Sequence, residues 1–194
     1  MNNKIAGPAP TVEQLKGELE RERYRSRYRT TLRSTVSLLL VVAAVAVLVA
    51  TVWMPVLQIY GSSMSPALQD GQVVIAVKGS RFTTGDVVAF YYNNKILIKR
   101  VIASSGDWVD IQADGTVFVN GEELNEPYIS EKALGECDLS FPYQVPESKI
   151  FVMGDHRSVS VDSRSSAVGC VAQEQIVGRV LFRIWPLSGL GAVG

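Results

Sequence analysis

The sequence predicts a mostly β domain that is anchored by one N-terminal transmembrane helix. Two observations predict this fold class: a single apolar run near the N-terminus, and a change after it to short β-type runs separated by turn dipeptides. The chain has 194 residues, of which 47% are hydrophobic. It can therefore bury the core of one domain and is not disordered throughout.

The apolar run extends from Val36 to Met54, and no charged residue occurs between Arg33 and Asp70. A helix of about 20 residues crosses a hydrocarbon core of roughly 30 Å. A buried helix would normally show a polar face, which this run lacks. A cleavable signal peptide is the closer alternative, because residues 44–46 read A-V-A, but the segment before the run is too long for one. We expect a transmembrane helix at residues 35–55.

The charge is unevenly distributed, although the formal net charge is zero, with 19 basic and 19 acidic residues. The first 34 residues hold eight basic and four acidic side chains, and six arginines directly precede the apolar run: Arg21, Arg23, Arg25, Arg27, Arg29 and Arg33. The positive-inside rule then places residues 1–34 in the cytoplasm as a basic helical segment. This gives a single-pass protein of the plasma membrane whose remaining, mildly acidic part lies outside. That acidic part is a poor partner for nucleic acid.

Short apolar or alternating runs follow the helix and predict an extracytoplasmic β domain at residues 56–186. The expected strands are 73–77, 87–92, 96–102, 108–111, 117–119, 150–153 and 176–185. Dipeptides such as Asp114-Gly115 and Asn120-Gly121 supply the positive φ angles of tight hairpins between them. Residues 187–194 are glycine-rich, and we expect them to form a flexible tail.

The two cysteines, Cys137 and Cys170, both fall in the expected exported domain, where a disulfide is chemically permitted. Two cysteines alone do not prove a bridge, so their pairing stays open. The sequence contains no CxxC pair, no HExxH and no phosphate-binding glycine loop. We therefore expect neither a metal ion nor a cofactor.

Candidate catalytic residues lie directly after the helix, in Gly61-Ser-Ser-Met-Ser-Pro-Ala-Leu68, and at Lys99 in a later apolar run. A serine hydroxyl needs a base to act as a nucleophile, and a neutral lysine can serve. Ile98 and Val101 are among the apolar neighbours of Lys99 in the sequence, so burial should lower its pKa. Taken alone, the first segment is interpreted as a turn, and Lys99 as an edge-strand charge that discourages aggregation.

Three boxes of the chain resemble those of type I signal peptidases. Residues 63–68 (S-M-S-P-A-L) resemble the family's S-M-x-P-T-L box, residues 99–102 its K-R-V-I box, and residues 154–164 its G-D-N-R-x-x-S-x-D-S-R box. They occur in the family's order, and the resemblance covers roughly residues 35–185. It implies a signal-peptidase-like β domain of several antiparallel sheets.

The resemblance also implies roles for individual residues. Ser63 would attack the scissile carbonyl and neutral Lys99 would take its proton, forming an ester acyl-enzyme. Ser160 would hydrogen-bond the lysine amine, with Asp162 and Arg164 as a supporting ion pair. The remaining matched positions, assigned to structural support, are Asp155, Arg157 and Arg100.

Substrates implied by the resemblance are secretory preproteins with small residues before the cut, processed at the outer surface of the bilayer. Pocket lining is expected from Met64, Leu68, Leu97 and Ile98, for which ordinary core packing is the alternative. The backbone N–H of Ser63 is the first candidate donor to the oxyanion. A second donor stays open, because Gly61 occupies a position where some family members carry serine, and Ser62 or another backbone N–H could substitute.

Several alternatives remain at this point. His156, the only histidine, could act as the base, and Ser62 could be the nucleophile. The chain could also be a self-cleaving Ser/Lys protease of the repressor type, although a membrane span stands where such proteins carry a DNA-binding head. From a different class, it could be an inactive membrane-tethered binding domain that has kept the fold.

Overall fold

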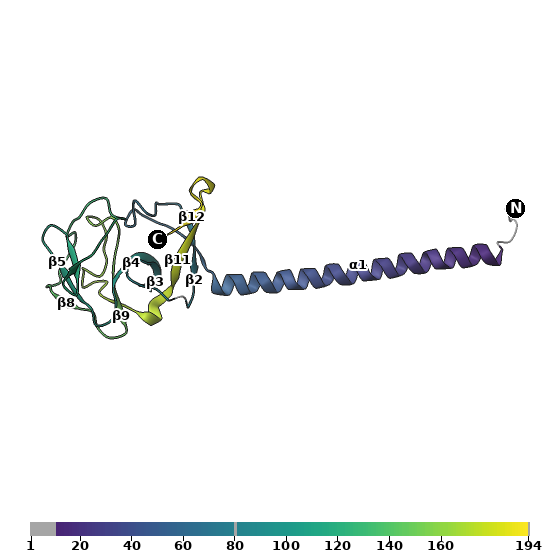
Figure 1. The fold of residues 1–194 in the computed structure, drawn as a ribbon, viewed down its shortest axis with the longest axis horizontal. Helices are drawn as coiled ribbons and strands as arrows, with labels where there is room; N and C mark the ends of the chain where they lie inside the picture. The colour runs from purple at the N-terminus through teal and green to yellow at the C-terminus, as the bar shows by residue number, and fades with distance from the viewer. Residues whose placement is uncertain (1–10, 80, 194) are drawn as a thin grey trace. The chain divides into compact units, whose positions relative to one another are not determined.

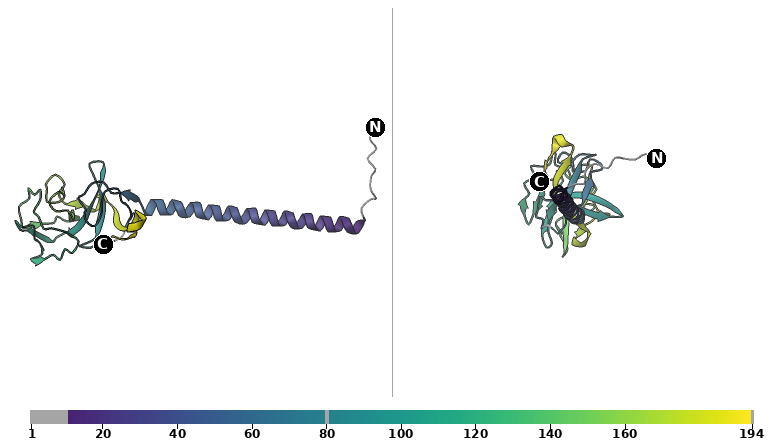
Figure 2. Two further views of the ribbon diagram at one scale, coloured as in Figure 1. Left: turned by 90° about the horizontal axis from the view of Figure 1, so that it is seen from above. Right: turned by 90° about the vertical axis from the view of Figure 1, so that its right-hand side faces the viewer.

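The computed structural model describes residues 11–79 and 81–193, and the chain divides into two compact units, Met1–Val49 and Ala50–Gly194. Helix α1 (Val12–Trp53) is one unbroken helix in the views of Figures 1 and 2. A capping box closes its start: the backbone N–H of Thr11 donates to the Gln14 side chain, and that of Gln14 donates to the Thr11 hydroxyl. The first ten residues of the expected cytoplasmic segment lie outside the described residues.

Helix α1 is long and apolar enough to cross a membrane. Its apolar side chains are exposed along the expected span, including Leu38, Val42 and Leu48. Exposed leucines and valines all round a helix are stable in hydrocarbon and unfavourable in water. The helix therefore has the surface of an element that packs in lipid.

The second unit consists mainly of antiparallel sheets, in agreement with the predicted fold class (Figure 1). Among the described residues, the larger sheet has eight strands in the order β1-β2-β11-β3-β4-β9-β10, with β12 paired to β11. Its strands are β1 (Val56–Gln58), β2 (Val73–Val77), β3 (Val87–Tyr92), β4 (Lys95–Ala103), β9 (Lys149–Met153), β10 (Val171–Ala172), β11 (Ile176–Trp185) and β12 (Gly191–Ala192). The smaller sheet has the order β7-β6-β5-β8, from β5 (Trp108–Ile111), β6 (Val117–Val119), β7 (Glu122–Glu123) and β8 (Tyr143–Gln144).

The end of the chain differs from the expectation of a flexible tail. A 3-10 turn, η2 (Leu187–Gly189), leads into β12, which pairs with β11 through Phe182 and Arg183. Another short 3-10 turn, η1 (Gln173–Gln175), precedes β11. Residues 187–192 are thus held by backbone pairing, because the turn brings the chain back alongside β11.

Two features of the larger sheet position the candidate site. Strands β3 and β4 form a hairpin whose turn residues, Asn93 and Asn94, have φ angles of 43° and 61°. The hairpin register sets Lys99 opposite Val88 in the middle of the sheet. The segment with Ser63 lies between β1 and β2, where the chain leaves the sheet and returns to it.

The last turn of α1 is joined closely to the larger sheet within the second unit. Only Met54 and Pro55 separate α1 from β1. The backbone N–H of Lys78 donates to the carbonyl of Trp53, and that of Ala76 donates to the carbonyl of Pro55, each at 3.0 Å. The helix end therefore continues into the sheet without a free linker.

Candidate functional site

The turn between β1 and β2 holds Ser63 in place through buried neighbours. Met64 and Leu68 are almost fully buried in an apolar cluster with Ile59, and the Leu68 N–H donates to the Met64 carbonyl at 2.8 Å. Gly61 has a φ of +84°, a region where a side chain would be strained. These anchors leave Ser63 itself only partly buried, at the surface of the turn.

Lys99 reaches this turn from β4. Its side chain is 3% exposed, and its Nζ lies 2.7 Å from Ser63 Oγ in a hydrogen bond that joins residues 36 positions apart. Ser62, the neighbouring hydroxyl, is exposed. The amine therefore contacts Ser63 as the resemblance implies.

The surroundings of Lys99 lower the pKa of its amine below the ordinary value of 10.5. Burial is the main cause, because a desolvated ammonium is less stable than the neutral amine. The carboxylates of Asp162 and Asp155 oppose this shift, whereas the Arg164 guanidinium adds to it. The net effect favours an amine that can accept a proton.

The loop of the third box packs against the backbone of Ser63. The N–H of His156 donates to the Ser63 carbonyl at 3.1 Å. A Cβ built on Gly154 would collide with Ser160 Oγ and lie 2.5 Å from the Ser63 carbonyl oxygen. Only glycine fits at this position, so residue 154 is part of what places the turn.

Ser160 does not make the hydrogen bond to Lys99 that the resemblance implies. Its Oγ is buried and has no hydrogen-bond partner among the described residues. It lies instead against Gly154, close to the Ser63 backbone. A buried hydroxyl without a partner is uncommon and costs free energy, so it is available to a group that enters the site.

Asp162 and Arg164 form the expected ion pair beneath this loop. Arg164 Nε donates to Asp162 Oδ1 and Nη2 donates to Oδ2, both at 2.8 Å, and neither side chain is exposed. Asp162 also accepts the backbone N–H of Gly154 at 2.9 Å. Arg164 donates to the carbonyl of Leu134 at 2.6 Å. The pair thus holds two segments of the chain against the loop.

A second buried network also holds the loop. Arg100 Nε and Nη2 donate to Asp155 at 2.8 and 2.7 Å, and its guanidinium carbon lies 3.9 Å from the centroid of the Tyr128 ring. Glu126 pairs with buried Arg157, which also donates to the Gly154 carbonyl at 3.0 Å. The Tyr128 hydroxyl donates to Glu126 at 3.0 Å, and burial, followed by the Glu126 charge, raises the pKa of Tyr128.

The sequence did not point to Glu126 or Tyr128 as members of this network. Both lie in the irregular segment after β7, where no periodicity distinguishes a buried carboxylate from an exposed one. The one available signal was that Arg100, Asp155 and Arg157 lie in the boxes at residues 99–102 and 154–164. Buried charges in such boxes need partners of opposite charge elsewhere in the chain. The partner of Arg157 could not be chosen among the many glutamates of the chain.

A small cavity of about 60 Å³ adjoins the Ser63–Lys99 pair. Its lining comes from two segments, the end of β1 with the turn after it and the start of β4: Gln58, Ile59, Tyr60, Gly61, Ser63, Met64, Ile96, Leu97, Ile98 and Lys99. Three of the four expected pocket residues, Met64, Leu97 and Ile98, are in this lining. Leu68 is not, because it is fully buried in the apolar cluster behind the turn.

The backbone N–H of Ser63 makes no hydrogen bond within the described part of the chain. It is therefore free to donate to an oxyanion. The N–H of Gly61 is not, since it donates to Asp70 Oδ1 at 2.7 Å. This removes one backbone group from the possible second donors.

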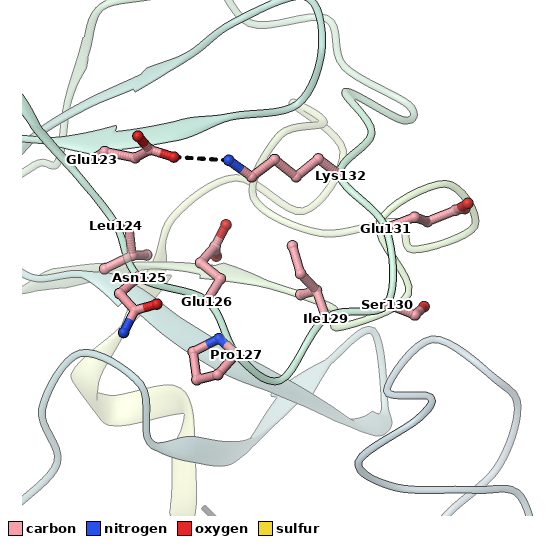
Figure 3. Close-up of a pocket in the computed structure, with 9 residues that line it drawn as sticks. All are labelled: Glu123, Leu124, Asn125, Glu126, Pro127, Ile129, Ser130, Glu131 and Lys132. Carbon is pink, nitrogen blue, oxygen red and sulfur yellow. Dashed lines mark hydrogen bonds and ion pairs between the residues drawn. The ribbon is translucent and has the colours of Figure 1, made fainter.

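A second hollow, of about 490 Å³, lies outside this site and is drawn in Figure 3. Its walls come from residues 123–132 after β6, and the dashed line marks the Glu123–Lys132 ion pair of 2.8 Å. None of the candidate site residues lines it. Its carboxylates already have partners, because Glu126 binds Arg157 and Glu131 accepts the Ser158 hydroxyl at 3.1 Å.

Other candidates from the sequence have different surroundings. The His156 imidazole has a buried Nδ1 without a hydrogen-bond partner in residues 11–79 and 81–193, and the hydrogen bond of this residue to Ser63 comes from its backbone N–H. Cys137 and Cys170 are both free, so they form no disulfide in this structure. In the described residues, His, Cys, Asp and Glu form no group of three or more that could hold a metal ion.

The structure thus defines a β protein in which a serine at the surface is paired with a lysine buried in the larger sheet. Comparisons with known proteins define the family. The family model described as signal peptidase, peptidase S26, matches residues 32–185. Signal peptidase IB of Staphylococcus aureus is 38% identical in an alignment of 151 positions, and the match covers 67% of this chain and 77% of that protein. The chloroplastic thylakoidal processing peptidase 1 of Arabidopsis thaliana is 38% identical over 144 residues, covering 66% of this chain and 41% of that protein.

Among solved structures, a signal peptidase I from Enterococcus faecalis matches with a TM-score of 0.42 and 28% identity, over 52% of this chain and 97% of that one. The family model covers most of the chain, and the staphylococcal relative exceeds 30% identity over most of its length. The chain belongs to the signal peptidase family, peptidase S26. This membership confirms the resemblance of the three boxes and counts against a self-cleaving repressor.

Proposed function

We propose that this chain is a membrane-bound endopeptidase that removes signal peptides from secreted preproteins, with Ser63 as nucleophile and Lys99 as general base. The observation that carries the proposal is the 2.7 Å contact between Ser63 Oγ and Lys99 Nζ, together with the burial of that amine. A nucleophile within hydrogen-bond reach of a base is what acyl transfer requires.

In the proposed reaction, the neutral Lys99 amine takes the Ser63 hydroxyl proton as Oγ forms a bond to the scissile carbonyl carbon. The Ser63 N–H donates to the oxyanion that develops. Collapse of this intermediate breaks the C–N bond, and the Lys99 ammonium gives its proton to the departing amine of the mature protein. The signal peptide is left as an ester on Ser63.

Deacylation reverses the proton path. Lys99, neutral again, takes a proton from water, whose oxygen attacks the ester carbon. The C–O bond to Ser63 then breaks, and the ammonium returns its proton to Ser63 Oγ. Ser160 is proposed to orient the lysine amine once a substrate tightens the site, since its hydroxyl has no hydrogen-bond partner in the part of the chain that the structure describes. Asp162, Arg164, Asp155 and Arg100 hold the loop and strand that carry these groups.

Substrate binding is proposed in the cavity between the two segments that line it. A signal peptide in extended form would lie between residues 58–61 and 96–98, with its small side chains against Met64, Leu97 and Ile98. The cavity volume of about 60 Å³ accommodates a methyl group better than a large side chain. Small residues before the cut are therefore the expected substrates.

A position at the outer membrane surface is proposed from the apolar face of the larger sheet. Val56 and Phe182 both stand opposite Ile75 in the sheet register, so the three side chains form one row on the same face. Val56 and Phe182 are exposed, as is Trp185. An apolar face next to the end of a spanning helix fits contact with lipid. Residues 1–34 would then be cytoplasmic, and residues 56–186 extracytoplasmic.

The test is cleavage of a preprotein in lipid vesicles by the full chain and by Ser63→Ala, Lys99→Ala and Lys99→Arg variants. All three should lose cleavage by about a thousandfold or more. Ser63→Ala removes the nucleophile, Lys99→Ala removes the base, and the guanidinium of Lys99→Arg is permanently charged and cannot accept the proton. Lys95→Ala is the matched control, since Lys95 is an exposed lysine on the same strand. Cleavage that survives in Lys99→Ala would refute the proposed base, and inactivity of the unchanged chain would favour a binding domain.

A further inference from the structure

The loop that carries Ser160 presents two apolar side chains to solvent. Val159 is 51% exposed and Val161 is 43% exposed, whereas Ser160 between them is buried. Ser160 follows a hydrogen-bonded turn, and its side chain is enclosed beside Gly154 while its two neighbours stay at the surface. Neither valine has a role in the chemistry proposed above.

Both valines lie near the scissile bond because the loop is fixed to the Ser63 backbone. The His156 N–H donates to the Ser63 carbonyl, and the His156 carbonyl accepts the N–H groups of Val159 and Ser160 at 3.2 and 3.1 Å. A Cβ built on Gly154 lies 2.5 Å from the Ser63 carbonyl oxygen and 2.6 Å from Ser160 Cβ. With 3.8 Å between consecutive Cα atoms, both valine Cα atoms fall within about 10 Å of that oxygen.

This distance matches the reach of the residues that follow the cut. The cavity beside Ser63 is lined by residues 58–61 and 96–98, which leaves the loop as a separate surface next to the nucleophile. An extended peptide advances about 3.3 Å per residue, so its first three residues after the scissile bond span about 10 Å. A substrate that fills the cavity and continues past Ser63 comes within reach of the loop.

We propose that Val159 and Val161 contact the first residues of the mature protein and select apolar side chains at those positions. This inference deepens the proposed function and rests on it. The charges of the same loop are buried in ion pairs, so the loop offers no exposed charge of its own to the substrate. An exposed carboxylate, that of Glu131, lies next to the loop and accepts a hydrogen bond from the hydroxyl of Ser158, the residue before Val159. Acidic residues just after the cut should therefore be disfavoured.

The test compares two preprotein peptides that share one signal sequence and differ only in the first two residues after the cut, Val-Leu in one and Asn-Asn in the other. The unchanged chain should cleave the apolar peptide with a kcat/KM about tenfold higher, as expected for apolar side chains in a shallow site. In the variant Val159→Asn with Val161→Asn, this ratio should fall to about one. Trp108→Asn is the control, because Trp108 is an exposed apolar residue of the smaller sheet.

A third substrate separates substrate contact from damage to the loop. A methyl ester with the same signal sequence has no residue after the scissile bond, so the double variant should hydrolyse it at the rate of the unchanged chain. A parallel fall in ester hydrolysis would overturn the inference in favour of a structural role. Equal cleavage of the two peptides by the unchanged chain would overturn this inference alone, whereas no cleavage of either would overturn the proposed function with it.

Discussion

Replacing Gly154 by alanine should separate placement of the nucleophile from its chemistry. Gly154 has no side chain that could transfer a proton. A Cβ at this position would nevertheless lie 2.5 Å from the Ser63 carbonyl oxygen and would collide with Ser160 Oγ. Ordinary contact begins near 3.4 Å, so the Ser63 backbone would have to move by about 0.9 Å. The serine hydroxyl can rotate away, but the carbonyl belongs to the main chain and cannot.

The magnitude follows from this displacement. Overpacking of this kind costs about 1–3 kcal/mol of unfolding free energy, which lowers the Tm of a domain of this size by roughly 2–10 °C. A shift of about 1 Å at a reacting atom costs about a hundredfold in rate. We therefore expect Gly154→Ala to lose about a hundredfold in kcat/KM while remaining folded.

The assay is preprotein cleavage beside thermal unfolding of the same samples. Gly191→Ala is the matched control, because a Cβ on Gly191 meets no atom within 4 Å and its φ is not positive. That variant should keep the activity and Tm of the unchanged chain. Full activity in Gly154→Ala would refute the reasoning, since it would mean that the turn does not depend on this close approach.

Three further predictions concern the base, a buried ion pair and a core residue. Activity should rise with pH through the lowered pKa of Lys99, because only the neutral amine accepts a proton. The variant Asp162→Asn should move the midpoint of the pH profile of kcat/KM to lower pH, because it removes a carboxylate that raises this pKa. An unmoved midpoint would argue against an electrostatic effect of Asp162 on Lys99. Glu126→Ala should cost about 3–5 kcal/mol in denaturant unfolding by leaving buried Arg157 unpaired, and a cost under 1 kcal/mol would contradict this. Leu68→Ala should cost about 2–5 kcal/mol of unfolding free energy without changing which residue is preferred before the cut, and altered preference would return Leu68 to the pocket.

The longer elements of the fold could be predicted from the sequence because their patterns are strong. The apolar run before Met54 and the strand from Ile176 to Trp185 both appear where hydrophobicity placed them. Strands of two residues, such as β7 and β12, were missed because so short a run carries no period. They exist because a turn returns the chain to a longer strand, as η2 does before β12.

The candidate site was predictable as far as its boxes but not in its supporting contacts. Ser63 and Lys99 come together because the β3–β4 hairpin register sets Lys99 in the sheet, and register depends on the turn. Leu68 was placed in the pocket because an apolar residue near a nucleophile can pack inward or line a cavity, and sequence does not distinguish the two. The unpartnered hydroxyl of Ser160 likewise depends on loop packing that no local pattern encodes.

The lack of a flexible linker between α1 and β1 has a consequence for which substrates the proposed enzyme would cleave. Since the Pro55 carbonyl is bonded to Ala76 of β2 and the Trp53 carbonyl to Lys78 directly after it, the sheet that carries Lys99 cannot move far relative to the last turn of the helix. A chain that spans the bilayer in this way would cleave substrates at a fixed distance from the membrane surface. Signal peptides whose apolar segment ends too deep or too high would then escape, whatever residues they carry at the cut.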